Sequence, residues 1–578
     1  MSYYALRKEG FGLEHLDEII QIFMTVTHIM IPLLALIVLF RCVRSMLAGR
    51  ADPETWGYLV SPDGKVQPLL HWECIIGRAR SSDVQLPYRD IASVHAVLRR
   101  DDKGGWTVHN LSRKGGVFIN NKRIENTAEL MDGDLLRCSS HSLQFAANTE
   151  LHRALQEKRR SVAGWRVAPG VTLFFLTLIQ ILLVLEFAVS KVADSIIPIA
   201  LAFAGLALME WLCYLLIRSM DRSGFEPETI AFFLCTLGLT VCCTATPGEL
   251  TFHILLLLGS VTVFFLFGWW LRDLTHVKAL RWPMAILALA LLALNLVAGH
   301  VTNGARNWIS IGGFSLQPSE LIKVAFIYVG ATTLERMFRS KSILFFIGFS
   351  ALCVGGLALM GDMGAALVFF ATFLVIAFMR SGSFATVLLA ITSAVMAGML
   401  VLSVKPYVAQ RFQTWGHVWE DVNGAGYQQT RALSAAASGG LFGQGAGNGW
   451  LKNIVAANTD MVWAMLCEEL GLIVAICAIL AIVALAVFTV KNAARNRSSY
   501  YVIAGCAAVT TMMVQVALNV FGSLDILPFT GVTFPFVSHG GSSLLSCWFL
   551  LAFIKAADTR RGGSFIVTTP NPEKEARR

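Results

Sequence analysis

Repeated runs of apolar residues, each about 20 residues long, constrain this fold most, because a helix of that length spans the hydrocarbon core of a membrane. The first run lies near residues 19–40, and roughly twelve more follow residue 168. Hydrophobic residues make up 55% of the 578-residue chain and charged residues 15%, which excludes a wholly soluble protein. The sequence predicts a multispanning α-helical membrane protein with about 13 transmembrane helices. The later runs are 169–189, 194–216, 228–245, 250–271, 280–299, 318–336, 342–360, 364–380, 384–403, 461–489, 500–521 and 535–555.

Lysine and arginine residues lie in alternate connections between these runs. They follow the first run at Arg41, Arg44 and Arg50, and recur in the segments 218–222, 272–281, 336–341, 380, 491–497 and 555–561. Because such residues favour the cytoplasmic side, we expect the N-terminus outside, the C-terminus and the polar stretch 51–165 in the cytoplasm, and the longest outer loop at 404–459. The first run then acts as a retained anchor and not as a cleaved signal peptide. The loops also account for the net charge of +9, so no nucleic-acid partner is predicted.

Residues 51–148 differ abruptly from the rest of the chain. Short runs of alternating polarity are separated there by Gly, Asp and Asn, a pattern that predicts a small β-sandwich. The ordered motifs are Gly77-Arg78, Asp83-Val84-Gln85-Leu86, Ser93-Val94-His95-Ala96, Asn110-Leu111-Ser112, Gly116-Val117-Phe118-Ile119-Asn120 and Met131-Asp132-Gly133-Asp134. Together these motifs resemble a forkhead-associated (FHA) domain over the whole insert.

This resemblance implies a cytoplasmic module that reads phosphothreonine peptides. Arg78 matches the family's phosphate-binding arginine, and Ser93, Arg113 and Lys114 complete a cationic pocket that bears a hydroxyl group. Two usual contacts are replaced, by Ala92 and Gly115, so phosphate-independent docking remains an alternative. His95 is expected to be a buried framework residue. The basic linker at 149–168 is expected to contact anionic membrane lipid.

Polar and glycine-rich segments recur beside the later apolar runs, near one membrane boundary. They are Gly304–Ile309, Gln317-Pro318-Ser319-Glu320 with Lys323, Gly361-Asp362-Met363-Gly364, the loop ending in Asn458-Thr459-Asp460, and Ser538-His539-Gly540-Gly541-Ser542-Ser543. Charged groups at membrane depth are costly and therefore indicate function. Glu320 and Lys323 share a helix face and are expected to pair. Isolated Glu186 and Glu210 are read as helix–helix contacts, and the cysteines, without CxxC pairs or neighbouring histidines, as small apolar core residues.

This combination resembles the SEDS family of RodA, FtsW and SpoVE proteins over residues 228–556, a core of ten spans. The resemblance implies an inverting peptidoglycan glycosyltransferase that polymerises lipid II in cell elongation, division or sporulation. Asp460 matches the family's catalytic aspartate. A carboxylate there is able to deprotonate the 4-hydroxyl of lipid II as it attacks the lipid-linked donor chain, with release of undecaprenyl pyrophosphate. Glu420 and Asp421 are rival bases on chemistry alone.

The resemblance also suggests supporting groups and partners. The expected binding or supporting residues are Arg306, Gln317, Ser319, Glu320, Lys323, Arg411, Gln428, Thr459, Glu468 and Ser542. Asp362 is a candidate ligand for a divalent cation, Mg²⁺ or Mn²⁺, and no organic cofactor is implied. The expected partners are lipid II, undecaprenyl-pyrophosphate-linked glycan, membrane lipid, a class B penicillin-binding protein that acts as transpeptidase, and a phosphoprotein or other ligand of the FHA domain.

Several positions depart from the family pattern. Val455-Ala456-Ala457-Asn458 lacks the usual glutamate and histidine before Asp460, and His539 replaces a tyrosine. A lipid-precursor flippase and an inert scaffold that signals through the FHA domain therefore stay open as alternatives. The expected division of the chain is 1–50 outer stub and anchor, 51–148 cytoplasmic FHA domain, 149–168 linker, 169–227 two additional transmembrane helices, 228–556 glycosyltransferase core, and 557–578 cytoplasmic tail.

Overall fold

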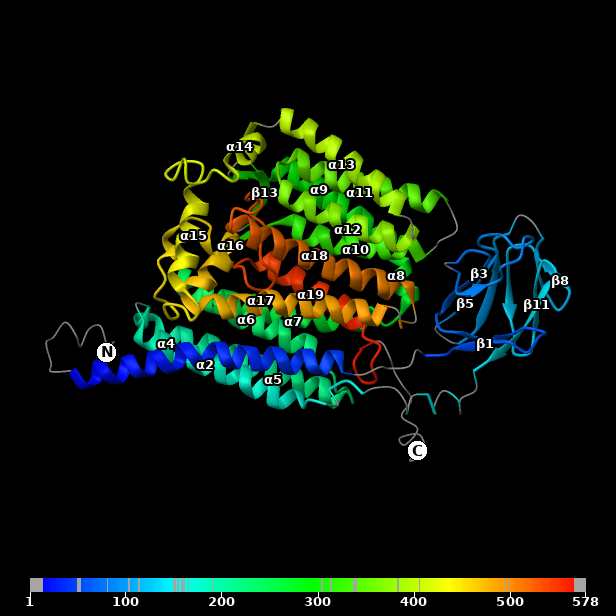
Figure 1. Cartoon of the computed structure of the whole chain (residues 1–578), viewed down its shortest axis with the longest axis horizontal. Coiled ribbons are helices and arrows are strands. Elements are labelled where there is room, and N and C mark those ends of the chain that lie inside the picture. Colours follow the sequence, from blue (N-terminus) through cyan, green and yellow to red (C-terminus); the bar gives the residue numbers. More distant parts are fainter. Residues whose placement is uncertain are drawn as a thin grey trace.

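A β-sandwich lies at one end of a large helical body in the computed structural model of the chain (Figure 1). The structure describes residues 14–48, 54–80, 82–101, 104–112, 115–148, 152, 155–156, 158, 162–164, 166–190, 192–302, 305–311, 314–335, 340–381, 384–404, 406–493, 495–496 and 498–565.

The sandwich consists of two sheets whose strands face each other across an apolar core. One sheet has the strand order β2-β1-β11-β10-β7-β8 and the other β4-β3-β5-β6-β9. Alternation of buried and partly exposed side chains, as in β3, directs residues such as Cys74 and Ile76 into the core. The strands are Gly57–Val60 (β1), Val66–Leu69 (β2), Glu73–Gly77 (β3), Val84–Gln85 (β4), Ala96–Arg100 (β5), Trp106–Asn110 (β6), Val117–Ile119 (β7), Lys122–Ile124 (β8), Thr127–Leu130 (β9), Leu135–Cys138 (β10) and His141–Ala147 (β11).

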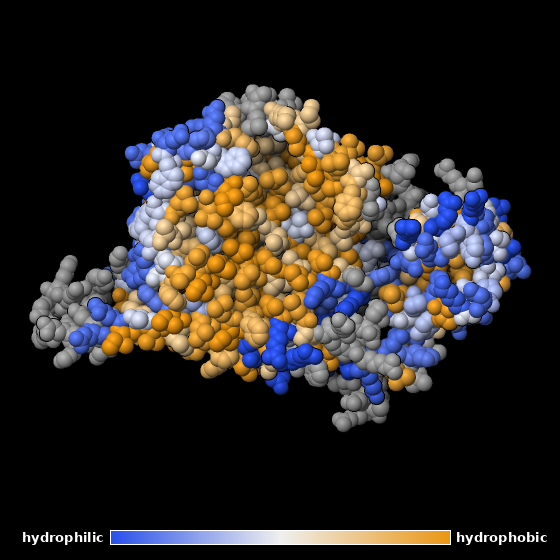
Figure 2. Space-filling view, in the orientation of Figure 1, coloured by the Kyte–Doolittle hydropathy of each residue, from blue (hydrophilic) through white to orange (hydrophobic). Residues whose placement is uncertain are grey.

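Each predicted span coincides with a long helix, and Figure 2 shows a broad apolar surface over these helices. Within the described residues, eight helices are long and apolar enough to cross a membrane, and four shorter apolar helices accompany them. The remaining one, α10, carries Glu320 and Lys323, which lower its hydropathy. The long helices are Glu14–Leu47 (α2), Pro169–Val189 (α4), Ile196–Ser219 (α5), Glu226–Ala245 (α6), Leu250–Trp270 (α7), Arg281–Ala298 (α9), Pro318–Glu335 (α10), Ser340–Leu359 (α11), Met363–Ser381 (α12), Phe384–Val404 (α13), Val462–Ala493 (α17), Ser499–Ser523 (α18) and Gly541–Ala556 (α19).

The connections between the predicted spans also contain short helices, turns and strands. The connection 404–459 contains the helices Pro406–Thr414 (α14) and Tyr427–Gly439 (α15) and the short turns Leu451–Asn453 (η3) and Ala457–Asp460 (α16). A small antiparallel sheet of His300–Thr302 (β12), Ala305–Ile311 (β13) and Phe314–Leu316 (β14) precedes α10. The other short elements are Ala193–Ser195 (η1), Pro247–Glu249 (η2) and Leu274–Ala279 (α8).

The span predicted at 461–489 is interrupted within α17. Gly471 has φ 85° and ψ 164°, a conformation that excludes the helix and is readily reached only by glycine. The backbone groups freed there bond to the chain that follows α15. Leu472 N donates to Gly440 O at 3.0 Å, and Gln444 N donates to Glu468 O at 2.9 Å. The nine-residue segment before the break is therefore a separate short helix, stabilised by the chain that follows α15.

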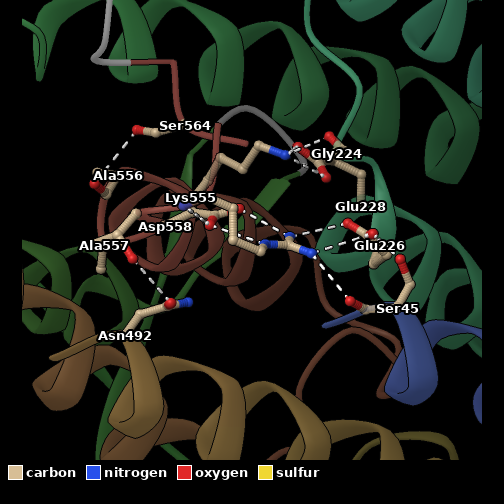
Figure 3. Close-up of polar contacts among 12 residues, drawn as sticks. Ser45, Gly224, Glu226, Glu228, Asn492, Lys555, Ala556, Ala557, Asp558 and Ser564 are labelled. Carbon is tan, nitrogen blue, oxygen red and sulfur yellow. Dashed lines mark hydrogen bonds and ion pairs between the residues drawn. The ribbon is translucent and has the colours of Figure 1, made fainter. Parts of the chain in front are cut away.

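A buried ion cluster joins the N-terminal helix to the C-terminal segment at the end of the body near the sandwich (Figure 3). Arg560 binds Glu226 at 3.0 Å and Asp558 at 2.9 Å, and Lys555 binds Glu228 at 2.9 Å. Ser45 of α2 donates a hydrogen bond to Glu226. Because buried charges are stable only when paired, this cluster fixes α2 and α6 against the segment after α19.

The sandwich also contacts the helical body directly. The His71 ring nitrogen Nδ1 lies 2.8 Å from Asn496 O, and Ser499 Oγ donates to Glu73 Oε2 at 3.3 Å. Asn496 belongs to the connection between α17 and α18, and Ser499 is the first residue of α18. Among the described residues, the sandwich therefore docks at the start of α18 and the connection before it.

Candidate functional site

Asp460 is the last residue of the short turn α16, at the end of the body away from the sandwich (Figure 1). Ala456, with φ 61°, starts the turn, and Asp460 N donates to Ala456 O at 2.9 Å. The amide of Asn519 in α18 donates to Asp460 O at 3.0 Å and to Val532 O at 2.8 Å. Ser538 Oγ donates to Thr459 O at 2.6 Å. The turn is thus fixed by α18 and by the loop that precedes α19.

The carboxylate of Asp460 is half-buried, and its environment favours the protonated form. Burial raises the pKa of Asp460 to about 6, the nearby charge of Asp362 acts in the same direction, and Thr459 and Arg411 oppose it. A Cβ at Gly531 would lie only 3.0 Å from Asp460 Oδ2, so glycine leaves space beside the carboxylate. A carboxyl group with this pKa is able to accept a proton near neutral pH.

A polar cavity lies next to Gly531. Its volume is about 30 Å³, which is room for about two water molecules. On its wall, Lys323 Nζ donates to Glu320 Oε2 at 2.7 Å and to Gln515 Oε1 at 3.2 Å, so the expected Glu320–Lys323 pair forms. The cavity is lined by Gln317, Ser319, Glu320, Lys323, Asp362, Ala365, Val368, Phe369, Gln515, Gly531, Val532 and Thr533.

Asp362 begins the connection into α12 and is buried, with 8% exposure. It accepts hydrogen bonds from Ala365 N at 3.0 Å, Gln317 Nε2 at 3.4 Å and Asn307 Nδ2 at 3.5 Å. Burial raises the pKa of Asp362 above its usual range, although these donors oppose the shift. Ser542 Oγ accepts from Gln317 N at 3.3 Å. The structure thus brings together Asp362, Gln317, Ser319, Glu320, Lys323 and Ser542, with Asp460 at the same end of the body.

Other predicted residues have contacts of a structural kind. Glu468 accepts from Trp450 N at 2.8 Å and Leu451 N at 3.1 Å, and Gln428 donates to Val455 O at 3.0 Å. These contacts stabilise the chain before α16. Arg306 Nη1 donates to Leu296 O at 3.0 Å.

Arg78 and Ser93 lie on neighbouring loops of the sandwich and are exposed. Arg78 N donates to Ala92 O at 2.9 Å, and Ala79 N donates to Ser93 O at 3.1 Å. Arg113 and Lys114 lie outside the described residues. His95 is fully buried, where Ala92 N donates to its Nδ1 at 3.2 Å. Its position agrees with a framework role.

Sequence reasoning missed two groups near Asp460. Gln515 and Asn519 on α18 contact Lys323 and the backbone of Asp460, but nothing in the apolar run that contains them pointed to this role. The twelve cysteines are buried and free, as expected. Cys242 is fully buried in the core, and it also has two histidine neighbours in space, which the sequence did not indicate.

Replacement of Gly439 by alanine is expected to destabilise the support of α16. A Cβ at Gly439 would clash with Cys467 O, so α15 would have to move away from the short helix after Asp460. Overpacking of this kind costs about 1–3 kcal/mol. Thermal unfolding in detergent measures the loss. Gly259 in α7, where a Cβ meets nothing within 4 Å, is the control, and equal melting temperatures for the two alanine variants would contradict the prediction.

Comparison with known proteins identifies two regions. Residues 249–562 match the cell cycle protein family of FtsW, RodA and SpoVE, and residues 74–138 match the FHA domain. Peptidoglycan glycosyltransferase RodA of Mycobacterium tuberculosis is 31% identical over 269 residues, 44% of this chain and 57% of the relative. The chain therefore spans little more than half the length of that relative.

Two further similarities extend this comparison. The probable peptidoglycan glycosyltransferase FtsW of Aeromonas salmonicida is 34% identical over 288 residues, which cover 47% of this chain and 72% of the relative. The crystal structure of the rod shape determining protein RodA of Thermus thermophilus is 24% identical, with a TM-score of 0.43, and covers 57% of this chain and 94% of that chain.

Proposed function

The chain belongs to the FtsW, RodA and SpoVE family, and from this premise we propose that it is a peptidoglycan glycosyltransferase that polymerises lipid II. The observation that carries the proposal is Asp460, a half-buried carboxyl group with a pKa of about 6 on a rigidly fixed turn. Curated relatives are named as enzymes of this class.

In the proposed reaction, Asp460 accepts the proton of the lipid II 4-hydroxyl as that oxygen attacks the anomeric carbon of the donor chain. The bond from that carbon to the pyrophosphate oxygen breaks, configuration inverts, and undecaprenyl pyrophosphate leaves. Arg411, whose charge acts on Asp460, and Arg306 are the cations proposed to face the leaving group. Glu320 and Lys323 neutralise each other, so we assign them to positioning the cavity wall.

The residues around Asp362 suit a hard divalent cation such as Mg²⁺ or Mn²⁺. Asn307 Oδ1 is buried and has no hydrogen-bond partner among the described residues, and it belongs to a side chain that already contacts Asp362. Such cations prefer carboxylate and amide oxygens, so Asp362, Asn307 and Gln317 would hold the ion. When bound, it would supply positive charge to the pyrophosphate.

We further propose that Asp460 acts at the outer face of a bacterial cytoplasmic membrane, with the N-terminus outside and the sandwich and C-terminus in the cytoplasm. The helical body and the family support membrane insertion. The sandwich and the segment after α19 share one end of the body, while α16 lies at the other (Figure 1). We also propose the division of the chain into an anchor, an FHA domain, a linker, two additional helices, a glycosyltransferase core and a tail, with the bounds predicted from the sequence. The proposed partners are a class B penicillin-binding protein, which acts as transpeptidase, and a ligand of the FHA domain.

The direct test is polymerisation of purified lipid II by the detergent-solubilised protein, with Mg²⁺ or Mn²⁺ and with a candidate transpeptidase in parallel. We expect long glycan strands from the wild type, and a large loss of yield with EDTA or with Asp362→Asn. Polymer formation by Asp362→Asn at the wild-type rate would contradict the cation site. Absence of polymer from the wild type in every arm would contradict the enzymatic proposal, and lipid II transport in vesicles would then favour a flippase.

The FHA domain is tested with the full-length protein and degenerate phosphothreonine peptides. Charge-assisted hydrogen bonds contribute about 1.5–3 kcal/mol, so Arg78→Ala is expected to weaken binding by at least about tenfold. Arg80→Ala, a change at another exposed arginine nearby, is the control. Equal binding of phosphorylated and unphosphorylated peptides would contradict phosphothreonine recognition and support phosphate-independent docking.

A further inference from the structure

Three potential metal ligands from separate elements meet close to α16. Cys242 lies near the end of α6, His253 in the first turn of α7, and His539 in the loop before α19. The Cys242 sulfur and one nitrogen of each ring all lie within 4.8 Å of one another. The two imidazole rings have centroids 5.6 Å apart.

We propose that Cys242, His253 and His539 bind a zinc-class transition metal ion. Zn²⁺ takes a thiolate at about 2.3 Å and imidazole nitrogens at about 2.0–2.1 Å in a tetrahedral arrangement, which places ligand atoms about 3.5 Å apart. The observed separations are close enough to be met by side-chain rotation. Glu249 Oε2 lies 3.5 Å from His539 Nε2, so this exposed carboxylate would have to turn toward the other two ligands to become the fourth.

The side chains of the group differ in their exposure. Cys242 is fully buried, where its sulfur lies 3.6 Å from Thr246 Oγ1, and His253 is 6% exposed. His539 and Glu249 are the more exposed members, at 15% and 58%, and they give the ion a way in.

The group is also linked to the turn that carries Asp460. His539 Nδ1 lies 3.3 Å from Asn458 Nδ2, and His539 N donates to Asn458 O at 2.9 Å. The second nitrogen of a metal-bound histidine usually donates to an oxygen, and the amide of Asn458 supplies one once it is turned over. The ion would thus fix α6, α7 and the loop before α19 around α16.

The chemistry of the ligands separates this site from the one at Asp362. A thiolate and two imidazoles select zinc-class metals, whereas carboxylate and amide oxygens select Mg²⁺ or Mn²⁺. Binding of Zn²⁺ at this group is measured without any assay of polymerisation, so its outcome is independent of the proposed glycosyltransferase activity.

The test uses the full-length protein in detergent, stripped with a chelator and reloaded with Zn²⁺ or with Co²⁺ as a spectroscopic probe. We expect one Zn²⁺ per chain, a cobalt–thiolate charge-transfer band, and a melting temperature that rises with added Zn²⁺. Cys242→Ser should abolish the band and weaken Zn²⁺ binding at least about 100-fold, as loss of even a ligand's supporting partner costs 10–100-fold. Cys243→Ser, a change at the adjacent buried cysteine, should leave both unchanged.

A second variant keeps the test decisive if Cys242→Ser does not fold. His253→Gln retains the thiol but removes one nitrogen ligand, so the charge-transfer band should shift and the affinity should fall. Wild-type protein that binds no Zn²⁺, or Zn²⁺ binding that is equal in the wild type, Cys242→Ser and His253→Gln, would overturn the proposal.

Discussion

Asp460→Asn is expected to lower the rate of lipid II polymerisation by about 10²–10⁴-fold, the usual contribution of a general base. The asparagine has nearly the same shape, and the main-chain bonds of this turn to Asn519, Ser538 and His539 do not involve the carboxylate. The loss therefore belongs to proton transfer and not to folding. Initial rates at saturating lipid II, with product length resolved on gels, measure it.

The pH dependence of the wild type follows from the same group. Asp460 acts as a base only when it is ionised, so the rate should rise as the pH increases through about 6.

The effect of pH on the stability of the folded protein has the opposite sign. A folded-state pKa of about 6, above the model value of 3.8, means that the stabilising contribution of the bound proton is complete below about pH 4 and is lost as the pH rises through about 6.

Asp460→Asn removes this ionisation and should therefore be more stable than the wild type at pH 7.5, by no more than about 3 kcal/mol, since one pKa unit corresponds to about 1.4 kcal/mol. Glu420→Gln, at an exposed carboxylate of the same connection, is the matched control and should keep the wild-type rate. A fully active Asp460→Asn variant, or loss of activity in Glu420→Gln alone, would show that the general base is a residue other than Asp460.

Arg560→Ala is expected to destabilise the folded protein by about 3–5 kcal/mol. Arg560 is 6% exposed and contacts Glu226 at 3.0 and 3.2 Å and Asp558 at 2.9 and 3.1 Å. Its removal leaves two buried carboxylates without their cation. Figure 3 shows that the cluster joins α2 and α6 to the segment after α19, so these elements should separate together. Chemical denaturation in detergent, followed by tryptophan fluorescence, gives the change in free energy of unfolding.

Arg561 offers a control of equal charge at the next position. Its side chain is exposed, so Arg561→Ala should change the free energy of unfolding by well under 1 kcal/mol. Replacement of Glu226 by glutamine in the Arg560→Ala background should recover part of the loss, because it removes one uncompensated charge. Equal stability of the two alanine variants would contradict the assigned role of the cluster.

The sequence predicted the spans well because a continuous apolar run of sufficient length has few other stable arrangements in a membrane. Predicted and observed limits agree closely for the span at 169–189, whereas helix α19 starts only at Gly541, six residues after the start of the span predicted at 535–555. The segment 535–540 mixes apolar residues with Ser538, His539 and Gly540, and its backbone forms the loop that contacts the residues before Asp460. Hydropathy does not distinguish a buried loop from a helix.

The candidate site was predicted less completely. Glu320, Lys323 and Asp362 stood out because charged residues are rare in apolar surroundings. Gln515 and Asn519 did not, since uncharged amides in a helix are compatible with many roles. The break at Gly471 was also missed, because one glycine within a long apolar run is usually tolerated in a helix.

The sequence by itself determined which segments are apolar helices, that the insert at 51–148 contains a β-sandwich, and which family the chain belongs to. These properties depend on local composition and on motifs that are contiguous in the chain. Only the tertiary structure decided that Asn519 fixes Asp460, that Arg560 meets Glu226, and that Cys242 lies beside His253 and His539. Each of these contacts joins residues from different elements of the chain. The relative positions of these elements arise from the whole set of side chains and not from any one segment.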